Sequence, residues 1–319
     1  MQLTTLSFVQ ADIEIGQTHT GLTESSEGFL NYFNQRQRAP FKPNFNLEVI
    51  GRTEQHNNDK RTQFFSAADL NAHSFVEYKY LAELSYFGLC KNKVNLNFGG
   101  DHSLSLATVE ASLRRNPNTL VIWIDAHADL NSAEESLSGN LHGMPVYYLM
   151  QKAEDRPKSM AWMRAHLAHE QMVYVGLRDL DHFERDYLEK NNIMHFTIHD
   201  LRTQGLEFCL NQLAKKISNF DNVHASFDID SLDTSYTLCT GVPVNNGMQI
   251  SELNAFAQMI SLTGKLRNLD VVEINPHLAK SPLEMNETYE IALQFIQQIA
   301  HERVMHASIY STNSAKLEI

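Results

Sequence analysis

Short runs of apolar, strand-forming residues alternate with amphipathic segments along almost the whole chain, and this alternation constrains the fold more than any other feature. It is typical of strands that helices connect into a parallel sheet. We expect eight strands, at residues 3–9, 47–50, 94–98, 119–124, 172–175, 194–197, 223–227 and 269–274. Helices are expected between them, for example at residues 74–89, 104–114, 183–191, 206–217, 251–262 and 284–302. The sequence therefore predicts a three-layer α/β/α sandwich around a central, mostly parallel, eight-stranded sheet.

The 319 residues contain no linker rich in proline, glycine or serine, so residues 1–319 are expected to form a single domain. The most polar stretch, residues 52–63, is expected to be an exposed loop or an insertion. No apolar stretch approaches the roughly 18 residues that a membrane-spanning helix needs. The first residues also lack the basic and apolar regions of a signal peptide. We therefore expect no membrane partner.

Charge and cysteine content narrow the class of protein further. The formal net charge is -12 and no run of basic residues occurs, so nucleic acid is not expected as a partner. With 43% hydrophobic and 20% charged residues, the chain is too apolar for a disordered protein. Its cysteines, Cys90, Cys209 and Cys239, are odd in number and widely spaced. That pattern argues against a disulfide framework and for a reducing compartment, so we expect a cytoplasmic protein.

Three of the expected strands run directly into residues that commonly bind metals. Open α/β sheets bind their ligands beyond the carboxyl ends of the strands. GGDHS at residues 99–103 follows one strand, and its glycines would allow a tight turn that exposes His102 at the strand tip. DAHAD at residues 125–129 follows another and places Asp, His and Asp at alternate positions, which share one face of an extended backbone. DID at residues 228–230 follows a third, and so many polar groups would be costly to bury without a cation.

Together these segments supply two imidazoles and four carboxylates, from His102, His127, Asp125, Asp129, Asp228 and Asp230. Such a set is rich in oxygen, with some nitrogen and no sulfur, and suits manganese better than a thiolate-binding metal. Four carboxylates are more than one divalent ion needs for charge balance, so we expect two metals. Two such ions about 3.5–4 Å apart can share a water and present hydroxide to an electrophilic carbon, which indicates a hydrolase. Aspartates at strand ends also form turns or helix caps. This structural alternative can account for any one of these residues, but it accounts less well for all three segments together.

Most of the other histidines need no functional explanation. His224 is counted among those in polar or helical contexts. His195 and His199 flank an expected strand and are interpreted as partly buried, hydrogen-bonded residues. None of these three is expected at the site.

The three metal-type segments resemble the signatures of the ureohydrolases, dinuclear manganese enzymes that include arginase, agmatinase and formiminoglutamase. GGDHS at 99–103, DAHAD at 125–129 and SFDID at 226–230 occur in the family's order and spacing. The resemblance covers nearly the whole chain. It implies the arginase-like version of the predicted fold and a homo-oligomer, either a trimer or a hexamer.

The same resemblance assigns the six ligands to two metals. It implies that one manganese is bound by His102 and Asp129. It implies that the other is bound by His127 and Asp230, and that Asp125 and Asp228 bridge both. The implied cofactor is two Mn2+ per subunit, or another divalent metal such as Co2+.

Other positions point to arginase within the family. SGNLHG at residues 138–143 resembles the arginase segment that holds the amino-acid end of the substrate. The resemblance implies that the α-carboxylate is bound by Asn131, Ser138 and Asn140. It implies that the α-amino group is faced by Asp181 and Glu184. Two alternatives stay open: the serine and asparagine beside a glycine could simply form a turn, and the two acidic residues could cap a helix.

The resemblance also implies three catalytic roles. His142 would be the proton shuttle, because an imidazole with a pKa of about 6.5 carries both forms near neutral pH. Glu273, at the end of the last strand, would pair with the substrate guanidinium, which favours a fork-shaped contact. Asp129 would orient the hydroxide that attacks the guanidinium carbon. The expected reaction is the hydrolysis of L-arginine to L-ornithine and urea.

Two alternatives to arginase remain. One is a relative acting on agmatine or formiminoglutamate, although agmatine lacks the α-carboxylate that the segment at 138–140 would hold. The other is a non-catalytic metal-binding relative, which would need neither His142 nor Glu273.

The chain departs from the family pattern in two places. Asp233-Thr234 stands where Asp-Pro is usual, and Val242 removes a hydroxyl near the substrate, followed by Asn245-Asn246-Gly247. These differences bear on turnover and fine specificity. The amino-terminal loop from Gly16 to Glu27 keeps only faint traces of the family's glycine-rich stretch, so no role is assigned to it.

Overall fold

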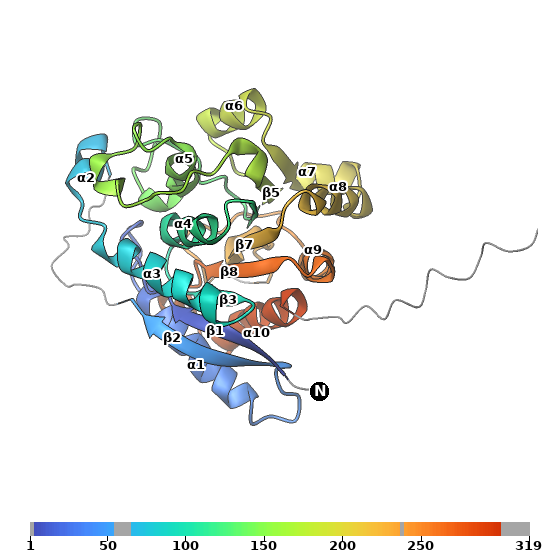
Figure 1. Cartoon of the computed structure of the whole chain (residues 1–319). Coiled ribbons are helices and arrows are strands. Elements are labelled where there is room, and N and C mark those ends of the chain that lie inside the picture. Colours follow the sequence, from blue (N-terminus) through green and yellow to red (C-terminus); the bar gives the residue numbers. More distant parts are fainter. Residues whose placement is uncertain (1–2, 54–64, 237–238, 301–319) are drawn as a thin grey trace, which may run out of the picture.

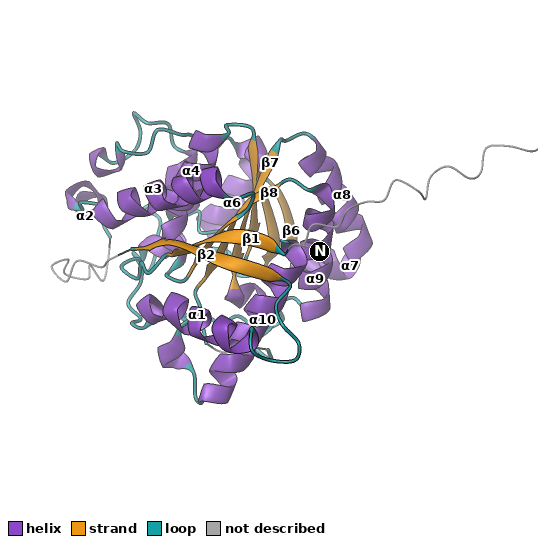
Figure 2. Ribbon diagram, turned by 60° about the horizontal axis from the view of Figure 1, so that its bottom comes forward, coloured by secondary structure: helices purple, strands orange, loops and turns teal. Residues whose placement is uncertain are grey.

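The structure is a computed structural model, and it describes residues 3–53, 65–236 and 239–300. Its strands form one sheet in the order β2-β1-β3-β8-β7-β4-β5-β6 (Figure 1, Figure 2). Every neighbouring pair is parallel. The eight predicted strands are confirmed as β1 (Thr4–Gln10), β2 (Phe45–Arg52), β3 (Asn95–Phe98), β4 (Thr119–Ile124), β5 (Met172–Leu177), β6 (Met194–Thr197), β7 (Asn222–Asp228) and β8 (Leu266–Val272).

All six predicted helices are present, with bounds shifted by a few residues. They are α3 (Val76–Lys91), α4 (Ser105–Arg115), α6 (His182–Lys190), α8 (Leu206–Ser218), α9 (Ile250–Thr263) and α10 (Pro282–Ile299). Four helices were not predicted: α1 (Ser25–Arg36), α2 (Ala67–Ala72), α5 (Pro145–Met150) and α7 (Ile198–Thr203). The last three have six residues each, too few to show a 3.6-residue period. The sequence of α1 contains glycine, serine and asparagine, which are weak helix formers.

Two predictions extend beyond the described residues. Of the polar stretch at 52–63, residue 52 ends β2 and residue 53 follows it, while 54–63 lie outside the described part. The predicted end of the final helix, 301–302, lies outside it as well. Among the described residues, no helix combines the length and apolarity that crossing a membrane requires.

The sheet separates two layers of helices, so the predicted α/β/α sandwich is confirmed. Along β4, the side chains of Leu120, Ile122 and Ile124 belong to the core cluster that includes α9 and α10. Val121 and Trp123 belong to the cluster that includes α3 and α4. Successive side chains of a strand point to opposite faces, so β4 contributes to both cores.

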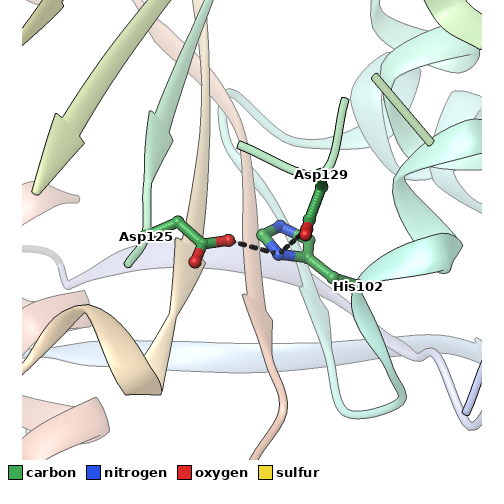
Figure 3. A group of neighbouring side chains, drawn as sticks. All are labelled: His102, Asp125 and Asp129. Carbon is green, nitrogen blue, oxygen red and sulfur yellow. Dashed lines mark ion pairs between the residues drawn. The ribbon is translucent and has the colours of Figure 1, made fainter. Parts of the chain in front are cut away.

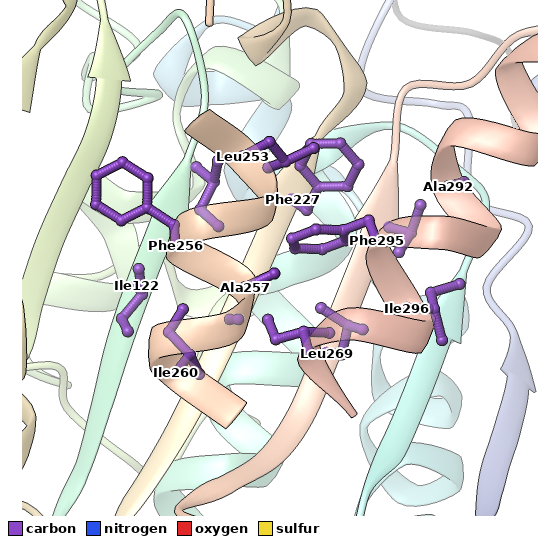
Figure 4. Close-up of a cluster of buried hydrophobic side chains, with 14 of the residues drawn as sticks. Ile122, Phe227, Leu253, Phe256, Ala257, Ile260, Leu269, Ala292, Phe295 and Ile296 are labelled. Carbon is purple, nitrogen blue, oxygen red and sulfur yellow. The ribbon is translucent and has the colours of Figure 1, made fainter. Parts of the chain in front are cut away.

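The core between the sheet, α9 and α10 is closely packed (Figure 4). The ring centroids of Phe227 in β7 and Phe295 in α10 lie 4.3 Å apart. Ile260 of α9 has none of its surface exposed and belongs to the same cluster. These contacts hold α9 and α10 against the strands that lead to the site.

Ile260→Val is expected to lower the free energy of unfolding by about 0.5–1.5 kcal/mol, because it removes one buried methyl group and leaves a small cavity. Denaturant unfolding of the purified protein measures the change. Leu262→Met, on the exposed side of the same helix, is the control and should change stability by less than about 0.5 kcal/mol. Equal losses in the two variants would contradict the burial of Ile260 between α9 and the sheet.

The strand order explains how distant parts of the chain meet. β3, β8, β7 and β4 are consecutive in the sheet. Because all four are parallel, the segments that follow them leave the sheet at the same edge. The three metal-type segments follow β3, β4 and β7, so they adjoin one another there.

Candidate functional site

The turn after β3 forms as its two glycines predict. Gly99 and Gly100 have φ values of 100° and 77°, which residues with a Cβ rarely adopt. A Cβ at Gly100 would lie 2.4 Å from the carbonyl oxygen of Ala11. The turn does not expose His102 as expected, since this residue is only 1% exposed. The ring of Trp123 stacks on the imidazole, with centroids 3.9 Å apart, and covers it.

Three carboxylates surround one nitrogen of His102. Its Nδ1 lies 2.9 Å from Asp125 Oδ2, 3.1 Å from Asp129 Oδ2 and 3.3 Å from Asp228 Oδ2. Figure 3 shows the first two carboxylates pointing at this nitrogen. Nδ1 is buried, yet no residue in the described part of the chain makes a hydrogen bond to it. Together, the nitrogen and the three oxygens are placed to hold a cation.

A second group lies beside the first. His127 Nδ1 is 3.1 Å from Asp230 Oδ2 and 3.4 Å from Asp125 Oδ1. Asp125 therefore faces His102 with one oxygen and His127 with the other, as the resemblance implies for a bridging ligand. The structure brings all six predicted ligand residues together at the carboxyl edge of the sheet.

Local backbone contacts hold these carboxylates in place. Asp125 accepts a hydrogen bond from the backbone N–H of His127 at 2.7 Å. Asp228 accepts one from the backbone N–H of Asp230 at 2.8 Å. Asp129 adopts a φ of 50°, a left-handed value that a non-glycine residue keeps only where its surroundings enforce it. The spacing of one residue between ligands is what makes the first two contacts possible.

The charges in this group call for cations. Burial raises the pKa of Asp230 to about 6, and the charge on Asp125 adds to the effect. Burial and the charges on Asp230 and Asp125 raise the pKa of Asp228 well above its usual value. Burial alone would lower the pKa of His102, but the surrounding carboxylates outweigh it and raise that pKa well above its usual value. Two divalent cations would compensate these carboxylates, and the nitrogen and oxygen donors suit manganese-type ions, so the residues fit a dinuclear centre.

A pocket opens over this group. Four of the six ligand residues line it, namely His127, Asp129, Asp228 and Asp230. Its wall also contains the predicted substrate and catalytic residues Asn131, Ser138, Asn140, His142, Asp181, Glu184 and Glu273. Gly143, from the predicted segment 138–143, lines it too, as do two residues that the sequence did not predict, Ser136 and Asp179. His102 and Asp125 belong to the metal group but do not line the pocket.

The segment around Gly139 is both a turn and part of the pocket. Ser138 Oγ accepts a hydrogen bond from the backbone N–H of Asn140 at 3.2 Å, and Gly139 has a φ of 66°. The turn alternative therefore holds, while both side chains still line the pocket. Ser136 Oγ lies 3.5 Å from Ser138 Oγ. A second serine, two residues before Ser138, was the signal that could have identified Ser136.

The acidic pair at the start of α6 also has two roles. The backbone N–H of Asp181 donates to Glu184 Oε2 at 3.0 Å, which confirms the helix-cap alternative. Glu184 Oε1 accepts from the backbone N–H of Leu130 at 2.9 Å and ties α6 to the loop after β4. Asn131 Nδ2 donates to Asp181 Oδ2 at 2.8 Å. Burial raises the pKa of Glu184 to about 7, although its backbone hydrogen bonds lower it.

His142 and Glu273 form a pair on the pocket wall. His142 Nδ1 lies 3.0 Å from Glu273 Oε1, which also accepts a hydrogen bond from the backbone N–H of His102 at 2.9 Å. Burial would lower the pKa of His142, but the hydrogen bond and charge of Glu273 outweigh it and raise the pKa to about 9. Glu273 has a φ of 63°, so this side chain, like Asp129, stands on a left-handed backbone.

The amino-terminal loop belongs to the site, although the sequence assigned it no role. Gln17 Nε2 donates to Glu273 Oε2. The backbone N–H of His142 donates to the Gly16 carbonyl at 3.1 Å, and Gly16 N–H donates to Asp101 Oδ2 at 2.7 Å. In the sequence, only the Gly16-Gln17 pair hinted at a role for this loop. The pair could not be interpreted before the fold placed it beside Asp101, His142 and Glu273.

At the residues that depart from the family pattern, local hydrogen bonds and backbone conformations keep the loop ordered. Asp233 accepts hydrogen bonds from the backbone N–H groups of Ser235 and Gly247, both at 3.1 Å, and so orders the loop without a proline. Asn246 adopts a φ of 60°, a conformation that asparagine tolerates better than most residues. Val242 is 40% exposed and lines the pocket. Only Val242 therefore changes the chemistry of the wall.

Sequence comparisons connect this site to known proteins. A sequence model described as "Arginase family" matches residues 36–301. The arginase of Neurospora crassa is 37% identical over 209 residues, which are 63% of this chain and 58% of the relative. The mitochondrial arginase-2 of Rattus norvegicus is 35% identical over 206 residues, again 63% of this chain and 58% of the relative. This chain thus spans just under 60% of the length of these curated relatives.

Solved structures share the fold over more of the chain. The arginase of Entamoeba histolytica, in complex with L-ornithine, has a TM-score of 0.78 and 27% identity, over 94% of this chain and 98% of that one. The proclavaminate amidino hydrolase of Streptomyces clavuligerus has a TM-score of 0.68 and 18% identity, over 95% and 93%. The second likeness concerns the fold alone.

Proposed function

The chain belongs to the arginase family, and on that premise we propose that it hydrolyses L-arginine to L-ornithine and urea. One observation carries the proposal. Two imidazoles and four carboxylates meet at the carboxyl edge of the sheet, and four of these six residues line a pocket whose wall also contains Glu273. The curated relatives and the structural relative with bound ornithine, all named arginases, support this substrate.

The metal group and the pocket wall have separate tasks. Two divalent cations held by the six ligand residues would lower the pKa of a shared water and supply the nucleophile for a guanidinium carbon. Asp129 lines the pocket, stands on a left-handed backbone and would orient that nucleophile by a hydrogen bond. Glu273 would pair with the guanidinium and hold its carbon over the site. The cations and Glu273 would thus already be in place to compensate the charge that develops on the reacting guanidinium group in the transition state.

His142 is suited to move a proton to the leaving amine. Its Nδ1 is held by Glu273 at 3.0 Å, so Nε2 is the nitrogen left to exchange protons in the pocket. A raised pKa keeps the imidazole protonated near neutral pH in the metal-free protein, ready to donate. The amine of ornithine would accept that proton as the carbon–nitrogen bond breaks.

In the outer pocket, neutral donors would bind one end group of the amino acid and a carboxylate would bind the other. Ser138, Asn140 and Asn131 would bind the α-carboxylate of arginine. Asp181, which lines the same wall, would face the α-amino group. Glu184 would act mainly by holding Asp181 and the loop after β4, since both its oxygens accept backbone hydrogen bonds.

Urea release tests the proposal directly. Metal-stripped protein is loaded with Mn2+ and given L-arginine, agmatine or formiminoglutamate in parallel. Urea from arginine, abolished by stripping the metal, is the expected result. Product from agmatine or formiminoglutamate alone would contradict the assignment of the outer pocket. Two bound cations with no product from any of the three would favour a non-catalytic relative.

Ser138→Ala is expected to raise the KM for arginine about five- to tenfold, because one hydrogen bond to the α-carboxylate is lost at an exposed position. Steady-state urea release measures KM and kcat. Agmatine lacks that carboxylate, so its binding constant, as substrate or as competitive inhibitor, should stay unchanged. A matching loss for agmatine would show that Ser138 acts on something other than the α-carboxylate.

Several broader features belong to the same proposal. We propose Mn2+ as the metal, supported by a donor set of nitrogen and oxygen, with Co2+ as the competing ion to compare in reconstitution. We propose one domain over residues 1–319 and assembly into a trimer or hexamer, which light scattering after gel filtration measures. A cytoplasmic location rests on the cysteine pattern, and fractionation tests it against the mitochondrial location named for several relatives, among them that of Rattus norvegicus.

A further inference from the structure

Asp270 is a buried carboxylate that has no role in the proposed reaction. It lies in β8, three residues before Glu273, and none of its surface is exposed. Asn97 Nδ2 donates to its Oδ1 at 2.7 Å, and Thr108 Oγ1 donates to its Oδ2 at 2.6 Å. Burying a charge in a sheet costs free energy that these hydrogen bonds must offset. A side chain this costly to bury invites a functional explanation.

His224 helps to hold this carboxylate. The structure corrects the expectation that His224 lies in a polar or helical context, because it is fully buried in β7. Its Nε2 lies 2.9 Å from Asp270 Oδ2, and its Nδ1 lies 2.8 Å from Ser112 Oγ. Burial would raise the pKa of Asp270, but His224 and the other donors outweigh it and lower that pKa. Asp270 is therefore ionised and accepts hydrogen bonds without donating any.

Ser226 links Asp270 to the metal group. Its hydroxyl oxygen lies 3.3 Å from Asp270 Oδ2 and 2.9 Å from His102 Nε2. Because an ionised carboxylate only accepts, the Ser226 hydroxyl donates its proton towards Asp270. The same oxygen then accepts from His102, which places the imidazole proton on Nε2.

This proton placement matters for the other ring nitrogen. In the neutral ring that cation binding requires, a proton on Nε2 leaves the lone pair on Nδ1, the atom that faces three carboxylates. Only a nitrogen with a free lone pair can bind a cation. Trp123, stacked on the ring within 7° of parallel, limits its tilt but does not choose between the two nitrogens.

We propose that Asp270 and Ser226 are positioning residues for the metal centre. Asp270 orients the Ser226 hydroxyl, and Ser226 fixes the orientation and the protonated nitrogen of His102, which sets the affinity of the metal position that His102 serves. The inference rests on the proposed dinuclear centre. It goes beyond that proposal because neither residue faces the cations or lines the pocket.

Cation titration of the metal-stripped, full-length protein tests the inference. Ser226→Ala is expected to weaken Mn2+ binding at one of two positions by about 10- to 100-fold, the usual effect of losing a group that orients a metal ligand. Asp270→Asn should do the same. Ser226→Thr keeps the hydroxyl and should restore affinity. Isothermal titration with Mn2+ resolves the two steps, and circular dichroism checks that each variant is folded.

Ser112→Ala is the matched control. It removes a buried hydroxyl from the same hydrogen-bonded group, but one that contacts His224 and not His102. It should leave both cation affinities unchanged. The inference is overturned if Ser226→Ala binds both cations as the unaltered protein does, or if Ser112→Ala weakens binding equally.

The outcome is separable from that of the proposed function. If the unaltered protein binds two cations, Ser226→Ala weakens one of them, and arginine yields no urea, the positioning role stands and arginase activity fails. If the unaltered protein binds no cation, both fail. A readout of affinity rather than turnover makes this distinction possible.

Discussion

In the Asp125→Ala variant, cation binding is expected to be lost at both positions and urea release to fall more than about 100-fold. Asp125 is the side chain that the two metal groups share, with Oδ2 at 2.9 Å from His102 Nδ1 and Oδ1 at 3.4 Å from His127 Nδ1. Removing a group that only orients a metal ligand lowers metal affinity or activity about 10- to 100-fold. Removing a ligand common to both positions should therefore exceed that range.

Metal content by mass spectrometry and urea release from arginine measure this loss. Glu110→Gln is a matched control, because it removes the charge from another buried carboxylate. The oxygens of Glu110 accept hydrogen bonds from the backbone N–H groups of Arg164 and Ala165, at 2.9 and 2.8 Å, instead of facing the imidazoles. Folded Glu110→Gln should keep both cations and its activity. Two cations retained by Asp125→Ala would refute a shared ligand.

Glu273→Gln is expected to lower kcat/KM for arginine by about 30- to 5,000-fold while both cations stay bound. The change keeps the shape of the side chain but removes the charge that would pair with the guanidinium. Breaking a buried charge pair costs about 2–5 kcal/mol, which corresponds to that range of rates. Glu273 is not one of the six ligand residues, so metal content should be unchanged. A variant that loses its cations as well would mean that Glu273 acts through the metal group.

The same variant has a pH signature in the metal-free protein. His142 has a pKa raised to about 9 by Glu273, so this pair stabilises the folded state fully below the unfolded value of 6.5. That contribution is lost as the pH rises through about 9. The hydrogen bond and charge of His142 lower the pKa of Glu273, against the effect of burial. The contribution of Glu273 to folding stability is therefore present above its usual pKa of 4.5.

Unfolding by denaturant from pH 5 to pH 10 measures this signature. The difference in unfolding free energy between the original protein and Glu273→Gln should be largest at about pH 5–6.5. It should disappear above about pH 9. A difference that grows with pH would show that the pair does not form.

The sequence predicted the strands of the sheet because most of them contain a short apolar run bounded by polar residues. β4 and β6 even match their predicted bounds. Helices were predictable where they are long enough to show a period, as in α9 and α10. The six-residue helices α2, α5 and α7 were not, although hydrogen bonds between Ser66 and Asp69 begin α2 and similar bonds between Thr197 and Asp200 begin α7.

The site divides in the same way. Its six proposed ligand residues could be singled out from the sequence because they directly follow buried strands, and five of them stand one residue apart, a spacing visible in the chain. Ser136 and Asp179, which line the pocket, and Gln17, which donates to Glu273, were missed because each lies in a loop whose sequence gave no signal. Ser226, Asp270 and His224 were missed because they lie within strands, where a sequence pattern shows burial but not hydrogen-bond partners.

By itself, then, the sequence determined the α/β/α class and the eight strands, and it singled out the six residues proposed to hold two metals, because strand periodicity and ligand spacing are local properties. Only the tertiary structure decided that these residues form two groups sharing Asp125, since the strand order β3-β8-β7-β4 brings together segments that are far apart in the chain. Only the tertiary structure also decided that Glu273 meets His142 and Gln17, and that Asp270 reaches His102 through Ser226. Such contacts depend on which strands become neighbours, and that is set by the packing of the whole sheet.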